Sequence, residues 1–149
     1  MEIKIKKITE DAVIPTAATS GSGAYDLYCP IMVMIPANKR AIIPLKFAME
    51  IPKGYVADIR PRSGYSANGF VGRNNGRHDC DVLLGTIDSD YRGEIGVILK
   101  NSSDRAFIID KGQRIAQMLI HKAEQVTFNE VDNLTETARG DGGFGHSGN

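Results

Sequence analysis

The sequence has no tryptophan, only two cysteines, no net charge and no long apolar run. Cys29 and Cys80 are too few for a disulfide framework, so we expect two free thiols. The 18 basic and 18 acidic residues cancel, which argues against binding to nucleic acid or to an anionic membrane through a long-range field. Any phosphate that the protein binds must therefore be held by a local cluster of donors.

No segment approaches the roughly 20 apolar residues of a membrane span. The first seven residues also lack the apolar run of a signal peptide. These absences predict a soluble, intracellular and most simply cytoplasmic protein without membrane contact. Its 149 residues, 42% of them hydrophobic, suffice for one domain with one core.

Short β-rich runs separated by turn residues recur along the chain. Apolar residues alternate at Ile3 and Ile5, and further runs cover residues 31–35, 41–45, 55–59, 95–99 and 115–120. No apolar stripe with helical spacing is longer than two turns. The spacing predicts an all-β barrel or sandwich.

Two regions depart from this pattern. Residues 68–81 are polar and rich in glycine, which predicts a long loop. The tail, residues 139–149, contains five glycines and a single aromatic residue, Phe144, so it is expected to be mobile on its own. Glycine amides with Arg139 and Ser147 could bind phosphate oxygens, and Phe144 could cover a flat base. A flexible tail of chance composition is the alternative.

Three further segments carry polar groups suited to a nucleotide. Arg62, Ser63 and Gly64 follow a predicted strand and could hold a phosphate, although an ordinary turn is the alternative. Asp88 lies in the acidic turn of residues 85–93, beside an aromatic ring and a cation. A carboxylate there could accept the proton of an attacking water, or could simply be solvated. Asp26 has apolar and aromatic neighbours, which predicts partial burial and a partner.

The segment of residues 111–117 begins as a turn and enters a strand. Strict alternation would place Gln113, Ile115 and Gln117 on one face and Arg114 and Ala116 on the other.

Taken in order, these segments resemble the five motifs of the homotrimeric dUTPases. The matching segments are residues 24–28, 62–64, 85–93, 112–117 and 139–145, so the resemblance extends over residues 23–149. It implies a distorted antiparallel jelly-roll-like β-barrel in residues 1–138 and a flexible arm in residues 139–149. It also implies a homotrimer with sites at subunit interfaces, each completed by the arm of another chain.

The implied reaction is hydrolysis of dUTP to dUMP and pyrophosphate, which keeps dUTP low and supplies dUMP for dTMP synthesis. In the family, an aspartate that matches Asp88 activates the water that attacks the α-phosphorus, and Mg²⁺ is held by the three phosphates. The resemblance implies no direct protein ligand to Mg²⁺, with Asp26 and Gln117 acting through water.

The resemblance also assigns the substrate contacts. Tyr91 packs on the deoxyribose, the backbone of residues 85–87 pairs with uracil, and the tail closes over the base and the γ-phosphate. The implied contact residues are Arg62, Ser63, Gly64, Gly85, Thr86, Ile87, Tyr91, Gln117, Arg139, Phe144, Gly145, His146 and Ser147.

Two departures from the family pattern stand out. The tail reads Gly-Phe-Gly-His-Ser-Gly, so the role of His146 is open, and the chain has additional residues between Gly64 and Asp88. Residues 78–81, His-Asp-Cys-Asp, lack the ligand separation of a zinc site, so we expect this insertion to be a solvated loop that leaves the chemistry unchanged.

Two alternatives to a dUTPase remain. A dCTP deaminase shares the fold, but its catalytic glutamate motif is absent here. A nucleotide-binding module without activity would be expected to lack Asp88 or the phosphate contacts, and the chain has both.

Overall fold

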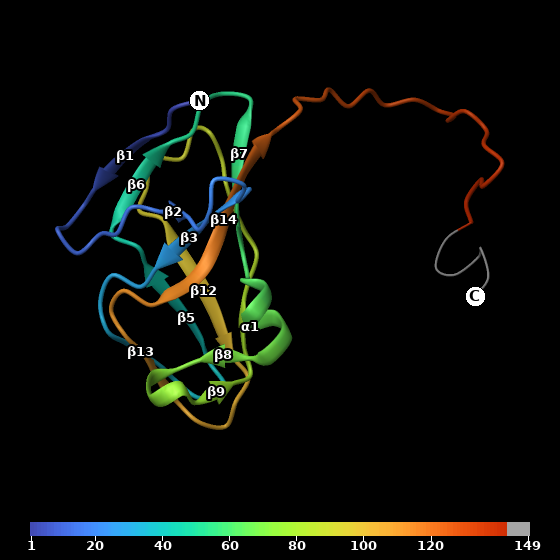
Figure 1. Cartoon of the computed structure of the whole chain (residues 1–149). Coiled ribbons are helices and arrows are strands. Elements are labelled where there is room, and N and C mark those ends of the chain that lie inside the picture. Colours follow the sequence, from blue (N-terminus) through green and yellow to red (C-terminus); the bar gives the residue numbers. More distant parts are fainter. Residues whose placement is uncertain (143–149) are drawn as a thin grey trace.

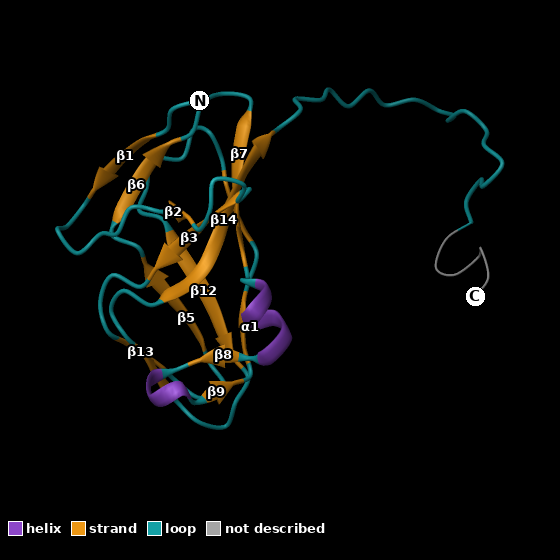
Figure 2. Ribbon diagram, viewed as in Figure 1, coloured by secondary structure: helices purple, strands orange, loops and turns teal. Residues whose placement is uncertain are grey.

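The computed structural model describes residues 1–142, apart from the side chain of Asn74, and these residues form an all-β fold (Figures 1 and 2). Every strand pair is antiparallel. The predicted all-β, jelly-roll-like class is therefore confirmed. The elements are β1 (Lys4–Lys7), β2 (Thr16–Ala17), β3 (Ala24–Tyr28), β4 (Val33–Ile35), β5 (Arg40–Pro44), β6 (Phe47–Glu50), β7 (Tyr55–Arg60), α1 (Ser63–Asn68), β8 (Phe70–Val71), η1 (Arg73–Asn75), β9 (Arg77–His78), β10 (Cys80–Val82), β11 (Gly85–Ile87), β12 (Gly96–Asn101), β13 (Phe107–Ile109) and β14 (Arg114–Lys122).

One hydrophobic cluster joins the two larger sheets. The five-stranded sheet has the order β11-β7-β14-β3-β2, and the three-stranded sheet has the order β10-β12-β5. Buried residues of both sheets, such as Ile59 and Met118 from the first and Ile43 and Leu99 from the second, belong to the same cluster. The core therefore lies between these sheets, and β11 is left at an edge of the larger one.

The five predicted apolar runs all contain strands: β4, β5, β7, β12 and β14. Their ends differ from the prediction by one or two residues, as expected for frayed strand ends. Several shorter strands were not predicted, among them β3, β6 and β11. Each has only three to five residues, and polar residues such as Asp26 and Thr86 interrupt their apolar pattern.

The prediction of a long loop at residues 68–81 is wrong. The chain forms a hairpin of β8 and β9 closed by η1, and Phe70 at its start has no exposed surface. Gly69 has a φ of +78°, and a Cβ at this position would lie 2.9 Å from the carbonyl oxygen of His78. The glycines thus permit close packing here, whereas the low average hydrophobicity concealed one anchoring ring.

The chain leaves the core after β14. The Ala123 amide still donates a hydrogen bond to the Gly54 carbonyl (2.9 Å), but residues 124–141 are all exposed and extend away from the sheets (Figure 1). We call residues 124–142 the described arm. The division of the chain at residue 138 remains a prediction. Within the described residues, no helix is long and apolar enough to cross a membrane.

Both cysteines are free, as predicted, and both are buried. Burial raises the pKa of the Cys29 thiol to about 11 and that of Cys80 to about 12. Both thiols are therefore protonated at neutral pH and behave as small apolar residues of the core.

Candidate active site

The predicted phosphate-binding residues outside the tail line one hollow of about 510 Å³, which we call the Asp26 hollow. Three structural elements meet there: β3, the start of α1 and the middle of β14. The lining residues are Ala18, Ser22, Gly23, Ala24, Asp26, Arg62, Ser63, Gly64 and Gln117.

Asp26 is the buried acid of this hollow. The sequence predicted one partner for it, and the structure shows two, both of them arginines. Arg62 donates from Nε to Asp26 Oδ1 at 2.9 Å, and Arg114 donates from a terminal nitrogen to Oδ2 at 3.3 Å. Asp26 is only 7% exposed, so these charge-assisted bonds offset the cost of burying its carboxylate. The pairs also fix where both guanidinium groups lie.

The alternation predicted for residues 113–117 is wrong because β14 contains a bulge. Arg114 pairs with Tyr28 but Ala116 pairs with Leu27, so Ile115 is an extra residue and Gln117 faces Asp26 in the register. Tyr28 and Asp26 are two residues apart on β3 and share a face, so the bulge puts Arg114 on the same face as Gln117. A bulge has no sequence signal as clear as alternation, and Arg114 was missed as a partner of Asp26 for that reason.

The predicted turn at residues 62–64 is the beginning of a short helix. Arg62 is the N-cap of α1, and its carbonyl accepts hydrogen bonds from the Tyr65 amide (2.9 Å) and the Ser66 amide (3.1 Å). The amides of Ser63 and Gly64, in the first turn, have no intrahelical acceptor. They therefore remain available to phosphate oxygens at the rim of the Asp26 hollow.

The residues predicted to contact the base, the sugar and the attacking water, apart from the tail, line a second hollow of about 230 Å³, which we call the Asp88 hollow. It includes the whole of β11 and the turn that follows. The lining residues are Ile59, Gly85, Thr86, Ile87, Asp88, Tyr91, Glu94, Ile95, Gly96 and Ile98. Asp88 itself is exposed. Because β11 is an edge strand, one side of its backbone has no strand partner among residues 1–142.

Arg92 fixes the acidic turn from within. It donates to the carbonyl oxygens of Ser89 (2.7 Å) and Tyr91 (2.9 Å). The Tyr91 hydroxyl donates to the Glu94 carbonyl at 3.2 Å and lies so close to Gly93 that a side chain there would collide with it. The turn therefore presents Tyr91 in a defined position, and Arg92 is a structural residue.

The two hollows share no lining residue and lie apart. Ile87, next to Asp88, pairs with Ala57 on β7, and β11 runs antiparallel to β7, away from Arg62. The five positions from Ala57 to Arg62 correspond to about 17 Å of extended chain. One chain thus does not bring Asp88 to the predicted phosphate contacts.

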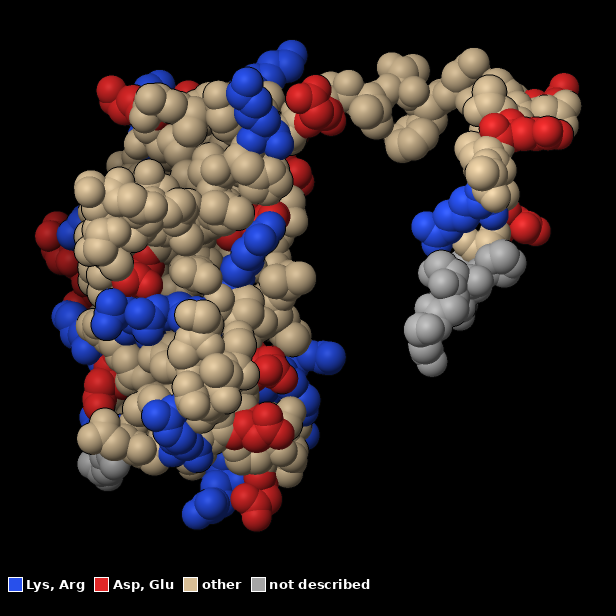
Figure 3. Space-filling view, turned by 45° about the vertical axis from the view of Figure 1, so that its right-hand side comes forward, with Lys and Arg blue, Asp and Glu red and all other residues tan. Residues whose placement is uncertain are grey.

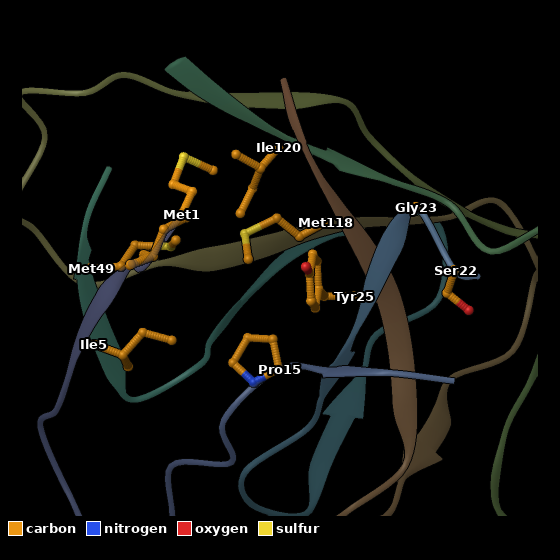
Figure 4. A pocket seen from close by; sticks show the side chains of 10 residues that line it. Met1, Ile5, Pro15, Ser22, Gly23, Tyr25, Met49, Met118 and Ile120 are labelled. Atoms are coloured by element: carbon orange, nitrogen blue, oxygen red, sulfur yellow. The ribbon is translucent and has the colours of Figure 1, made fainter. Parts of the chain in front are cut away.

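A third hollow, of about 330 Å³, is apolar and contains no charged side chain (Figure 4). It lies among β1, β6, β3 and β14 and borders the Asp26 hollow at Ser22 and Gly23. Such a lining offers a phosphate no cationic side chain. The larger side chains around it are Met1, Ile3, Ile5, Pro15, Tyr25, Met49, Met118 and Ile120.

Of the predicted tail contacts, the structure describes only Arg139, which lines neither hollow. Arg139 is part of the described arm and donates from Nε to the Gly142 carbonyl at 2.8 Å. Phe144, Gly145, His146 and Ser147 lie outside the described residues. On the face drawn in Figure 3, basic and acidic side chains are interspersed around broad uncharged areas.

Asp58, which sequence reasoning missed, holds β11 from the outer face of the sheet. Its carboxylate accepts hydrogen bonds from Thr86 Oγ1 (3.0 Å), from Arg60 (3.1 Å) and from His121 Nε2 (3.0 Å). Burial alone would raise the pKa of Asp58, but these hydrogen bonds and the charge of His121 hold it below its ordinary value. The cluster joins the three neighbouring strands β11, β7 and β14.

Asp58→Asn should lower the free energy of unfolding at neutral pH by about 1 kcal/mol, because the amide accepts weaker hydrogen bonds. The folded-state pKa lies below the unfolded value, so the stabilisation is complete above the unfolded pKa of about 4 and is lost as the pH falls through the folded value. Urea unfolding at a series of pH values checks this. The gap between wild type and variant should close in acid.

Asp104→Asn is the matched control, because its carboxylate is 89% exposed and its salt bridge is to Arg105, which is 82% exposed. Its effect should be small at every pH. A gap for Asp58→Asn that stays constant from neutral to acidic pH would mean that the carboxylate charge has no part in holding the strands.

Comparison with known proteins identifies relatives over nearly the whole chain. The sequence profile described as dUTPase matches residues 10–148. A deoxyuridine 5'-triphosphate nucleotidohydrolase of Arabidopsis thaliana is 45% identical over 145 residues, which cover 97% of this chain and 82% of the relative. One from Hydrogenobaculum sp. (strain Y04AAS1) is 46% identical over 149 residues, covering 99% of both proteins.

Solved structures share the fold. The dUTPase of Staphylococcus bacteriophage 80alpha, solved with dUpNHpp, aligns with a TM-score of 0.88 at 24% identity and covers 99% of this chain and 98% of its own. A mutant dUTPase from phage phi11 of S. aureus, described for its coordination of a structural Mg(II) ion, aligns with a TM-score of 0.79 at 21% identity, covering 89% and 98%.

Proposed function

This chain belongs to the dUTPase family, a family of dUTP hydrolases, and from that premise we propose that Asp88 activates the water that attacks the α-phosphorus. Hydrolysis of dUTP gives dUMP. The observation that carries the proposal is the division of the predicted site into an Asp26 hollow and an Asp88 hollow, because about 17 Å of extended chain separates Arg62 from Ala57, the partner of Ile87 next to Asp88. A site that needs both must combine different chains.

We propose a homotrimer in which the Asp88 hollow of one chain meets the Asp26 hollow of the next, with the tail of another chain closing the site. Exposed apolar side chains support burial against other copies. Ile42 on β5 is 69% exposed and Leu84, before β11, is 75% exposed, while Phe128 on the described arm is 93% exposed. Single exposed apolar residues are common, but these lie beside the incomplete site or on the arm.

The base would be recognised by the free backbone edge of β11, at Gly85, Thr86 and Ile87. Uracil presents an acceptor at O4 and a donor at N3, and cytosine reverses both. A fixed N–H and C=O pair would therefore leave buried polar groups unpaired against cytosine. Tyr91, held by its bond to the Glu94 carbonyl, would pack on the deoxyribose and exclude a 2′-hydroxyl.

The phosphates would be held in the Asp26 hollow by the Arg62 guanidinium, the Ser63 hydroxyl and the Gly64 amide. In the tail, Arg139, Gly145, His146 and Ser147 would bind the γ-phosphate, and Phe144 would stack on uracil.

The residues of the Asp26 hollow suit an Mg²⁺ ion that keeps its waters. Both oxygens of Asp26 already accept guanidinium hydrogen bonds, which leaves lone pairs for water and little charge for direct ligation. The amide of Gln117 donates to the Pro61 carbonyl at 2.9 Å, so its oxygen can accept from water. Mg²⁺ bound to the substrate phosphates would neutralise their charge.

In the proposed step, the Asp88 carboxylate takes a proton from the water as the water oxygen bonds to the α-phosphorus. The bond from the α-phosphorus to the oxygen that bridges to the β-phosphorus breaks, and pyrophosphate leaves with the electron pair. Arg62 stabilises the charge that develops on the phosphates. The enzyme would act where nucleotides are made, most simply in the cytoplasm, where it would keep dUTP low and supply dUMP for dTMP synthesis.

The test is to offer dUTP, UTP, dCTP and dTTP separately with Mg²⁺ and to measure release of pyrophosphate and of ammonia. We expect pyrophosphate from dUTP alone. Ammonia from dCTP would identify a deaminase instead, and binding without either product would identify a module without activity.

A further inference from the structure

A stack of side chains, which we call the aromatic column, runs from the Asp26 hollow into the hairpin of β8 and β9. The Arg62 guanidinium carbon lies 5.6 Å from the centre of the Tyr65 ring. The Tyr65 ring centre is 4.3 Å from that of Phe70, which in turn is 5.6 Å from that of Phe107. His78 of β9 stacks on Phe107 at 4.2 Å with an interplanar angle of 16°.

The far end of the column is tightly packed. Phe70 has no exposed surface and Phe107 is 5% exposed. At Gly72, a Cβ would lie 3.0 Å from Phe107 Cδ2 and 3.1 Å from His78 Nε2. The hairpin backbone therefore packs closely against Phe107. A shift of the hairpin backbone would move the rings that the hairpin contacts.

Hydrogen bonds tie the same hairpin to both sides of the Asp26 hollow. Nε2 of the Gln113 side chain, just before β14, donates to the Val71 carbonyl, and the Arg77 guanidinium donates to the Asn68 carbonyl at the end of α1 (3.0 Å). The Tyr65 hydroxyl donates to the Arg114 carbonyl at 2.7 Å. The hairpin thus contacts α1 and the start of β14, the two elements that carry the arginines of Asp26.

We propose that the β8–β9 hairpin is a positioning element for phosphate binding, which holds α1 and Arg62 in place through the aromatic column. This inference rests on the proposed function, because it takes the Asp26 hollow as the phosphate site. Among the described residues, the lining of that hollow includes no residue of the hairpin, so the hairpin acts through Tyr65. This proposal differs from the expectation, drawn from the sequence, that the insertion between Gly64 and Asp88 is a solvated loop that leaves the chemistry unchanged.

The physical reason is that α1 cannot fix itself. It has six residues, none of them fully buried, and its link to the core is the partly buried Tyr65. Arg62 has a long side chain whose ordering costs entropy unless other contacts have already fixed it. Asp26 fixes one side of its guanidinium and Tyr65 supports the other, so the phosphate meets an ordered cation.

The test compares Tyr65→Leu and Phe70→Leu with wild type. Both should raise the KM for dUTP roughly tenfold or more, with a smaller change in kcat, because the phosphate contacts are displaced before chemistry begins. Calorimetric titration gives a readout without turnover. Binding of inorganic pyrophosphate should weaken by a similar factor, whereas binding of deoxyuridine, which lacks phosphates, should stay as in wild type.

Two controls separate positioning from general stability. Tyr65→Phe keeps the ring and removes only the hydroxyl that donates to the Arg114 carbonyl, so its KM should rise much less than that of Tyr65→Leu. Phe47→Leu removes the same atoms from β6, where Phe47 is 1% exposed, and should lower the melting temperature like Phe70→Leu while leaving KM unchanged.

Wild-type KM and pyrophosphate affinity in both Tyr65→Leu and Phe70→Leu would overturn the inference, even if both variants were less stable. If Phe70→Leu does not fold, Tyr65→Leu still decides, because Tyr65 is only partly buried. Lack of dUTP turnover in wild type would count against the proposed function instead, and pyrophosphate binding by the variants would still test the hairpin.

Discussion

Asp88→Asn should lower the turnover of dUTP by roughly 10²- to 10⁴-fold, because the amide cannot take the proton of the attacking water. Binding of dUTP should change little, since asparagine has the same shape and Asp88 is assigned to the water and not to the phosphates. Asp88 is exposed, so the fold should tolerate the change. Steady-state kinetics with titration of a non-hydrolysable dUTP analogue measures both quantities.

Asp90→Asn is the matched control, because it removes the same charge two residues further along the same exposed turn. Its effect on turnover should be far smaller. Near wild-type turnover in Asp88→Asn, or equal losses in the two variants, would contradict the assignment of the general base.

Removal of residues 139–149 should slow hydrolysis roughly 100-fold, because the site would lose the groups assigned to the γ-phosphate and uracil and would stay open to water. The melting temperature should be nearly unchanged, since the described residues from 124 to 141 are exposed and add nothing to the core. Kinetics, thermal unfolding and the mass of the assembly measure these effects. Unfolding of the shortened chain would show that the tail is structural.

Mixing the two defective variants gives the sharpest test of a shared site. In mixed trimers, a shortened chain can supply Asp88 while an Asp88→Asn chain supplies the tail. Refolding the variants together should therefore restore part of the activity that each lacks alone. If the mixture stays as inactive as its components, one chain must supply both groups, and the proposed arrangement is wrong.

The sequence predicted the parts of the fold that obey simple periodicity. The apolar runs around Ile43, Ile59 and Met118 became strands, and the apolar setting of Asp26 correctly indicated a buried acid with a partner. These features depend on neighbours in the sequence, and their physical signal is local.

The rest depended on geometry that is not local. The bulge at Ile115 shifts the register of one strand by a residue, and the average polarity of residues 68–81 concealed the buried ring of Phe70. The separation of Asp88 from Arg62 follows from the antiparallel pairing of β11 with β7. The sequence of neither segment indicates which strand it pairs with. The motifs therefore predicted the groups of the site without showing how one chain distributes them.

The edge position of β11 has a consequence for how the enzyme tolerates genetic change. In the proposed arrangement, main-chain N–H and C=O groups of β11 read the base, and every residue type except proline supplies both, so a missense mutation at Thr86 leaves the reading atoms in place. Discrimination between uracil and cytosine would then depend on the backbone conformation of this strand and not on the identity of its side chains. Sequence drift on this strand can alter stability long before it relaxes the choice of base.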